Sequence, residues 1–426
     1  MNKETYTLSR TSRQVKPGYK KTPVGIIPED WEVKTLGEIV ANKGLIRGPF
    51  GSALKKDFFV PIGYKVYEQQ NAIYKDFERG SYFVDEAKFQ ELRRFAVRKN
   101  DFIMSCSGTI GELYQIPGNY LEGVINQALL LIRLNPLKIL YGFFENIFQT
   151  PLIKNRILES QGGAIKNLVG MNQIRKLKLP IPPLDEQKSI ANCLSAWDSG
   201  IKKLSQLIQA KKQQKEGLMQ QLLSGKKRLS GFNGKWKEVK VQKFAREYKE
   251  KNQKDKKITV LSCTKYDGLV PSLEYFGRKV YGDDLSKYKK VPYGYFAYAT
   301  NHIEEGSIGI QNLVDVGLVS PMYTVFNCSK EINNNFIYLV FKSHDMINEY
   351  NRRMEGSINR RGGLRWNSFK KIKLKLPSLE EQTAIANILQ TADKEIELLE
   401  QKLSSFHQQK KGLMQVLLTG EKRLIE

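Results

Sequence analysis

Only a few stretches of this chain combine residue types that could perform chemistry. The most suggestive is LDEQK, beginning at Leu184, because adjacent carboxylates beside a lysine can hold a metal ion for phosphodiester cleavage. A second copy of the stretch, LEEQT from Leu379, has Thr383 in place of Lys188. Both copies begin an expected helix, where acidic residues are stabilised by the positive end of the helix dipole. We therefore interpret these carboxylates as helix-start residues and not as a nuclease site.

The other catalytic motifs that we considered are incomplete. A DNA adenine methyltransferase needs [ND]PP[FYW], but the one PP pair, in IPPL from Ile181, lacks the preceding Asn or Asp. A phosphate-binding loop needs GxxxxGK[ST], and SGKKR from Ser224 lacks the first glycine and the final hydroxyl. The histidines are isolated in the sequence, without zinc-type spacing: His302, His344 and His407. We expect no catalytic residue, metal site or cofactor in this chain.

Charge points to a different class of function. The 426 residues carry a formal net charge of +25, which favours a nucleic acid as partner over a membrane surface. No run of 18 apolar residues predicts a membrane span, and the first 21 residues form a basic polar tail with no signal-peptide core. The four cysteines are scattered, which suits the reducing cytoplasm. We expect a cytoplasmic protein that binds nucleic acid.

A duplicated segment reveals how the chain is organised. GLMQQLLSGKKRL begins at Gly217, and GLMQVLLTGEKRL begins at Gly412, 195 positions later. The match extends backwards without a gap to PPLDEQ at Pro182 and PSLEEQ at Pro377. Because this period is far too long for a solenoid repeat, it indicates a duplicated pair of domains.

Each copy of the duplicated segment has apolar residues in heptads. The pattern runs over about five heptads and predicts a long coiled-coil helix that ends at Gly225 or Gly420. Two unrelated amphipathic helices, each packed on its own domain, are the alternative. The predicted seam residues are Ile190, Leu194, Trp197, Ile201, Leu204, Ile208, Leu218, Leu222, Ile385, Leu389, Ile396, Leu399, Leu403, Phe406, Leu413 and Leu417.

A block with landmarks in the same order precedes each helix. Both blocks have a tryptophan segment, a glycine turn (SGTIGEL from Ser107, EGSIGI from Glu305), a helical stretch, a glycine-rich basic loop and an alternating strand. We therefore expect two α+β domains of one architecture. The expected boundaries are 1–21 for the basic tail, 22–181 for the first domain, 182–229 for the first helix, 230–376 for the second domain and 377–426 for the second helix.

This ordered set resembles the specificity subunit of type I restriction–modification systems. The resemblance rests on IPEDWEVKTLGEI, the GTIG and GSIG turns and two LxEQxxIAxxL…KxGLMQxLLxGxKRL helices, and it covers nearly the whole chain. It implies two target recognition domains, each reading one half of a split DNA sequence in the major groove. It also implies that the helices pair antiparallel, set the distance between the halves and dock two methyltransferase subunits.

The resemblance further implies restriction–translocation subunits as partners. S-adenosylmethionine, ATP and Mg would then be bound by the partner subunits. A coiled-coil scaffold whose basic domains bind RNA remains an alternative, although no RNP-type motif is found in the sequence.

Candidate DNA contacts follow from residue type. Lys and Arg in glycine-rich loops can reach phosphates, and amides can read base edges in the major groove. Buried turn-forming amides are an equal alternative for the second group. The phosphate candidates are Arg47, Lys55, Lys56, Lys166, Asn167, Asn359, Arg360, Arg361 and Arg365, and the base-reading candidates are Gln69, Gln70, Asn71 and Asn301.

Overall fold

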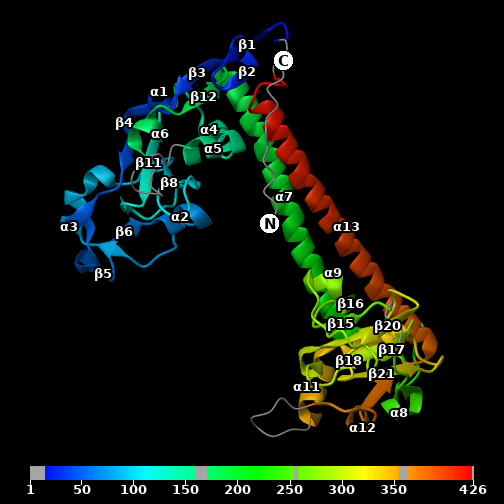
Figure 1. Ribbon diagram of the computed structural model, residues 1–426. Coiled ribbons are helices and arrows are strands. Elements are labelled where there is room, and N and C mark those ends of the chain that lie inside the picture. Colours follow the sequence, from blue (N-terminus) through cyan, green and yellow to red (C-terminus); the bar gives the residue numbers. More distant parts are fainter. Residues whose placement is uncertain (1–14, 160–169, 254–257, 355–362, 425–426) are drawn as a thin grey trace. The chain divides into compact units, whose positions relative to one another are not determined.

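The computed structural model describes residues 15–159, 170–253, 258–354 and 363–424 (Figure 1). Residues 1–204 together with 402–426 form one compact unit, and residues 205–401 form a second. Each unit contains one globular domain and part of both long helices, α7 (Leu184–Leu223) and α13 (Leu379–Leu417). None of the described helices is long and apolar enough to cross a membrane.

The first domain is built on a four-stranded antiparallel sheet in the order β4-β11-β8-β9. Its central strand β11 reads LLLIRL, and side chains that alternate along a strand face opposite sides of the sheet. Leu130 and Ile132 lie in the main core, whereas Leu129 and Leu131 lie in a second cluster on the other face. The strands are β4 (Val40–Arg47), β11 (Leu129–Leu134), β8 (Phe102–Ser105) and β9 (Leu113–Gln115).

Smaller elements surround this sheet. A second sheet has the order β10-β6-β7-β5, in which β10 and β6 are parallel, and two further strand pairs are β1-β2 and β3-β12. Their bounds are β1 (Tyr19–Thr22), β2 (Gly25–Pro28), β3 (Glu32–Thr35), β5 (Phe59–Val60), β6 (Tyr64–Tyr67), β7 (Phe83–Val84), β10 (Gly123–Ile125) and β12 (Lys178–Ile181). The helices are α1 (Leu36–Ile39), α2 (Gln69–Tyr74), α3 (Glu86–Glu91), α4 (Tyr141–Phe148), α5 (Pro151–Glu159) and α6 (Met171–Arg175).

The second domain repeats the central sheet in the order β14-β21-β18-β19. Where the first domain has its second sheet, this domain has two separate strand pairs, β15-β16 and β17-β20, and a third pair is β13-β22. The strands are β13 (Lys237–Lys240), β14 (Ala245–Tyr248), β15 (Leu261–Thr264), β16 (Gly268–Pro271), β17 (Lys289–Pro292), β18 (Phe296–Ala299), β19 (Ile308–Ile310), β20 (Val316–Val319), β21 (Tyr323–Cys328) and β22 (Lys373–Leu376). The helices are α8 (Val241–Phe244), α9 (Ser272–Phe276), α10 (Asn334–Phe341), α11 (His344–Arg353) and α12 (Trp366–Phe369).

Two sequence predictions need correction here. Each expected helical stretch is a pair of helices, because Pro151 begins α5 and the Ser343 side chain caps α11 by accepting from the Met346 amide. The two glycine turns are also not equivalent. Gly108 and Gly111 lie in the turn between β8 and β9, but Gly309 lies inside β19, where a Cβ would fall 2.5 Å from the Leu269 nitrogen.

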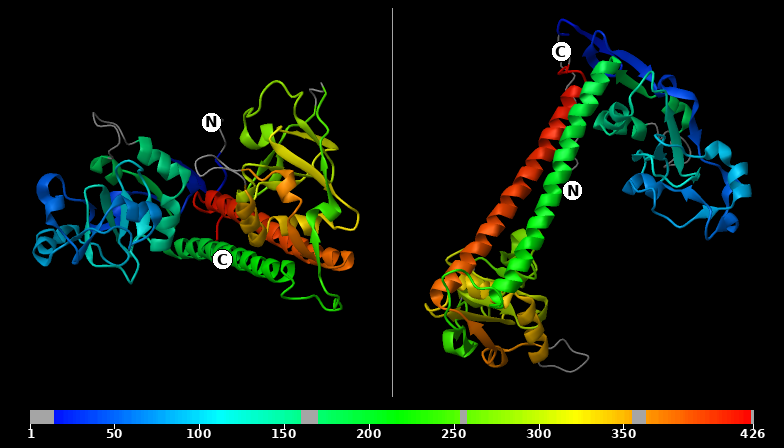
Figure 2. Two further views of the ribbon diagram at one scale, coloured as in Figure 1. Left: turned by 90° about the horizontal axis from the view of Figure 1, so that it is seen from below. Right: turned by 180° about the vertical axis from the view of Figure 1, so that it is seen from behind.

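The two long helices pair antiparallel (Figures 1 and 2). In the first unit the start of α7 shares a core cluster with Leu417, and further along Trp197 packs on Phe406 with ring centroids 5.3 Å apart. In the second unit Lys211 pairs with Glu395 at 2.6 Å and Lys215 pairs with Asp393. All the predicted seam residues are buried or half-buried.

The duplication is visible in individual contacts of the helix pair. Lys410 pairs with Asp198 at 2.6 Å, and these residues occupy the same repeat positions as Lys215 and Asp393. The helices end before Gly225 and Gly420, which have φ of +69° and +72°, the left-handed conformation that glycine adopts without strain. The predicted α+β class with two similar domains and two long antiparallel helices is confirmed.

Candidate nucleic-acid interface

A glutamine near the start of each long helix holds the neighbouring domain. Gln187 Oε1 accepts from the Leu140 amide at 2.8 Å, and Gln382 Oε1 accepts from the Asn333 amide at 3.0 Å. Each glutamine also donates from Nε2 to the carbonyl of the proline that lies five residues earlier. Leu140 and Asn333 precede α4 and α10, so both domains are fixed to their helices in the same way.

An arginine beyond the end of one long helix clamps the start of the other. Arg423 donates to both Glu186 oxygens, at 2.7 and 2.8 Å, and Arg228 donates to both Glu381 oxygens, at 2.7 Å. Both carboxylates are almost fully buried. Such bidentate pairs are strong and directional. We name the Arg423–Glu186 pair the first clasp and the Arg228–Glu381 pair the second clasp.

The first clasp has additional partners. Arg423 also binds both oxygens of Asp30, at 2.9 and 2.7 Å, and Trp31 Nε1 donates to Glu186 at 2.8 Å. The hydrogen bond from Arg423 holds the pKa of Asp30 below its ordinary value. One carboxylate of each stretch that opened the sequence analysis, Glu186 or Glu381, is thus a structural ion-pair partner. The sequence analysis missed both arginines, although each lies in the KRL that the two copies of the repeat share, and each glutamate lies in the shared EQ.

A group of polar side chains gathers where β4 and β8 end and β11 begins. Arg47, the last residue of β4, donates from Nε to the Gln127 carbonyl at 3.1 Å, and its guanidinium lies 5.7 Å from the centre of the exposed Phe50 ring. The Gln69 amide lies 3.8 Å from the place where Gly108 would carry a Cβ. We name Arg47, Phe50, Gln69, Gly108 and Gln127 the first loop edge.

The structure separates the three neighbouring amides at the start of α2. Asn71 is fully buried; its Oδ1 accepts from the Glu68 amide, and its Nδ2 donates to the carbonyls of Asp76 and Arg79. Its prediction as a base-reading residue is therefore wrong, because its hydrogen-bonding groups hold the following loop. Gln70 donates to Glu68 Oε2 at 2.7 Å. Gln69 differs, since its Oε1 is buried and has no hydrogen-bond partner among the described residues.

The remaining candidates fall into two groups. Lys55, Lys56 and Arg365 are exposed, and Asn301 is half-buried in the turn between β18 and β19. Five candidates lie outside the described residues: Lys166, Asn167, Asn359, Arg360 and Arg361. The Leu364 amide donates to the Thr300 carbonyl at 2.8 Å, so the chain that follows the second basic loop packs on this turn.

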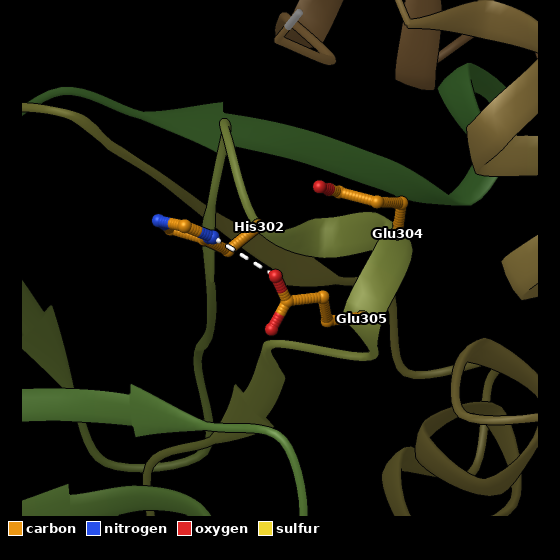
Figure 3. Close-up of side chains that lie close together, drawn as sticks. All are labelled: His302, Glu304 and Glu305. Atoms are coloured by element: carbon orange, nitrogen blue, oxygen red, sulfur yellow. Dashed lines mark hydrogen bonds and ion pairs between the residues drawn. The ribbon is translucent and has the colours of Figure 1, made fainter. Parts of the chain in front are cut away.

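The turn between β18 and β19 brings His302 next to two carboxylates (Figure 3). His302 Nδ1 lies 3.4 Å from Glu305 Oε1, and one ligand atom each from His302, Glu304 and Glu305 lie within 4.8 Å of one another. These carboxylates follow His302 by two and three residues, so its neighbours in space are also its neighbours in the sequence. Exposed acidic groups often gather without a metal ion, so these three residues alone do not define a metal site. We name Thr300, Asn301, His302, Glu304 and Glu305 the second loop edge.

Comparison with known proteins places this architecture in a family. The model of the type I restriction modification DNA specificity domain matches twice, at residues 28–213 and 233–406. The putative type I restriction enzyme MjaX specificity subunit of Methanocaldococcus jannaschii is 26% identical over 450 residues, which cover 95% of this chain and 97% of that protein. The MjaVIII specificity subunit of the same organism is 25% identical over 431 residues, covering 93% and 94%.

Solved structures share the fold. The HsdS subunit from Thermoanaerobacter tengcongensis has a TM-score of 0.56 at 14% identity, covering 93% of this chain and 98% of that one. A chain from a type I R-M system, solved to explain complex assembly and conformational transition, has a TM-score of 0.59 at 15% identity, covering 93% and 99%. These likenesses show a shared fold with two similar domains and two long helices. The chain belongs to the type I restriction–modification DNA specificity family, as its sequence motifs predicted.

Proposed function

We propose that this chain is the DNA-recognition subunit of a type I restriction–modification complex, in which each domain reads one half of a bipartite target in the major groove. The double match of the specificity-domain model, once in each half of the chain, is the observation that carries this proposal. The net charge of +25 supports it, because contacts to DNA phosphates require lysine and arginine.

The helix pair gives the complex its symmetry in this proposal. Two methyltransferase subunits would dock on α7 and α13, because the duplicated sequence presents each of them with an equivalent surface. Restriction–translocation subunits would then join this core. Adenine methylation with S-adenosylmethionine, and ATP- and Mg-dependent cleavage, are assigned to these partner subunits. The chain itself carries neither a complete [ND]PP[FYW] motif nor a complete phosphate-binding loop.

The alternative of an RNA-binding scaffold has no support from the relatives, whose names describe restriction enzyme specificity subunits. DNA methylation distinguishes the two directly. We would map methylated adenines by long-read sequencing in cells that coexpress the cognate methyltransferase with this chain, and in cells that lack only this chain. The expected result is a two-part motif with an unread gap that disappears when the chain is absent. Methylation that is the same in both strains would contradict the proposal.

A further inference from the structure

We infer that Arg47 and Gln69 are the base-reading pair of the first domain, with Arg47 binding O6 and N7 of a guanine and Gln69 binding N6 and N7 of an adenine. The inference rests on the proposed function and deepens it, because it assigns individual bases to individual side chains. The argument starts from the backbone that fixes the first loop edge.

Backbone hydrogen bonds join four segments at this edge. The Gly48 amide donates to the Leu129 carbonyl at 3.0 Å, and the Cys106 amide donates to the Ala128 carbonyl at 2.8 Å. These bonds hold the chain after β4 and after β8 on either side of the start of β11. The Asn126 amide donates to the Tyr67 carbonyl at 2.9 Å, which brings in the segment that leads to Gln69. Side chains that project from such a frame are positioned before any ligand binds.

Arg47 is oriented but incompletely bonded. Its Nε is held by the Gln127 carbonyl and its guanidinium lies beside the Phe50 ring, whereas Nη1 is buried and has no hydrogen-bond partner among the described residues. Buried donors in proteins are nearly always paired, with protein groups or with ordered water, so Nη1 needs a partner that the described chain does not supply. A planar guanidinium with a fixed orientation suits the two acceptors on the major-groove edge of guanine.

Gln69 provides the complementary observation. Three consecutive amides occupy residues 69–71, and the structure uses Gln70 and Asn71 internally while leaving the Gln69 carbonyl oxygen buried without a partner in the described chain. The neighbouring Gly108, with φ of +64°, has no side chain to cover the amide. A glutamine amide can accept from adenine N6 and donate to adenine N7 at the same time.

Phe50 supports the same surface. Its ring is 64% exposed beside the Arg47 guanidinium and is therefore available to a ligand that binds there. Contact with a thymine methyl group in the major groove would bury part of the ring. Binding of a phosphate is the competing role for Arg47. Loss of a phosphate contact would weaken binding to every sequence, whereas loss of a guanine contact would lower discrimination at one position.

The test uses the full-length chain in complex with its methyltransferase, and it reads the methylation motif of each variant. Arg47→Ala should lower discrimination at one guanine position of one half-site by roughly tenfold or more. Gln69→Leu should do the same at one adenine position of that half-site. The other half-site should stay unchanged in both variants, which also shows that the second domain is folded. Gln70→Ala and the second-domain variant Glu304→Gln serve as matched controls that leave this half-site intact.

Binding measurements cover variants whose methylation is too weak to map. Fluorescence anisotropy with the wild-type target duplex and its single-base substitutions gives the discrimination ratio at each position. Wild-type ratios for both Arg47→Ala and Gln69→Leu would overturn the inference, as would uniformly weaker binding of Arg47→Ala to all duplexes with wild-type ratios, the signature of a phosphate contact. A wild-type complex without any bipartite motif would instead contradict the proposed function.

Discussion

The two domains share a central sheet and its attachment to a long helix, and they differ in the loops at the edge of that sheet. Both have a four-stranded sheet with the same order of equivalent strands, and both are fixed to a long helix by one glutamine, Gln187 or Gln382. The first loop edge presents a guanidinium, an amide and glycine, whereas the second presents an imidazole and two carboxylates. The comparison indicates that the attachment to the helices is kept in both domains, whereas the side chains at the loop edges differ.

The basic loops should show the largest difference between the domains. The loop of the second domain carries Arg360 and Arg361, followed by Arg365, and that of the first carries Lys166. Replacing all three arginines with alanine should weaken DNA binding about a hundredfold or more at physiological salt, and should reduce the slope of log K against log salt by about 2.7. Lys166→Ala should reduce the slope by about 0.9. Equal slopes for the triple variant and the wild type, measured by titration at several salt concentrations, would remove these arginines from the interface.

The two clasps should differ next most, in how much faster the chain around each opens when its arginine is removed. The first clasp joins residues 237 positions apart. The second joins residues 153 positions apart, and from Arg228 the chain continues directly into the second domain. Arg423→Ala removes the hydrogen bonds to both Glu186 and Asp30. We expect this to destabilise the closed state of the first clasp by at least about 1.4 kcal/mol, which corresponds to a tenfold change in the equilibrium for its opening. We therefore expect amide hydrogen exchange in residues 418–424 to become about tenfold faster or more.

Arg228→Ala is the matched variant in the second unit. Exchange in residues 224–230 should increase less, because the chain is anchored on both sides of Arg228, by α7 before it and by β13 after it. Equal increases in the two variants would show that covalent continuity contributes nothing to the second clasp.

The two halves of the helix pair should differ in stability and in its dependence on salt. Trp197 packs on Phe406 in the first unit, and the corresponding repeat positions hold Ala392 and Lys211, which pairs with Glu395. Trp197→Ala should cost about 2 kcal/mol of stability, less than a fully buried tryptophan. Glu395→Gln should cost less than about 0.5 kcal/mol, because both partners are partly exposed. Urea unfolding at low and high salt would check both values, and a salt-independent effect of Glu395→Gln would contradict this explanation.

The sequence revealed the repeated organisation better than the details of the site. Heptads and a C-terminal glycine depend on neighbouring residues, so the helices could be predicted closely from local pattern. The partner of Glu186 could not, because Arg423 is 237 residues away and burial of the pair is a tertiary property. Asn71 and Gln69 look alike in the sequence, and only the packed loop shows that one amide is fully used and the other is not.

The first clasp also has a consequence for the order of synthesis. Leu417 and Leu418 belong to the core of the first domain, and the Tyr19 hydroxyl donates to the Gly420 carbonyl at 3.0 Å. A ribosome makes most of this domain early, but it must translate residues 205–401 before it reaches the segment that completes the core. At 5–20 residues per second this interval lasts roughly 10–40 s. The domain whose synthesis begins first is therefore completed last, and part of its apolar core stays uncovered until the end of α13 has been made.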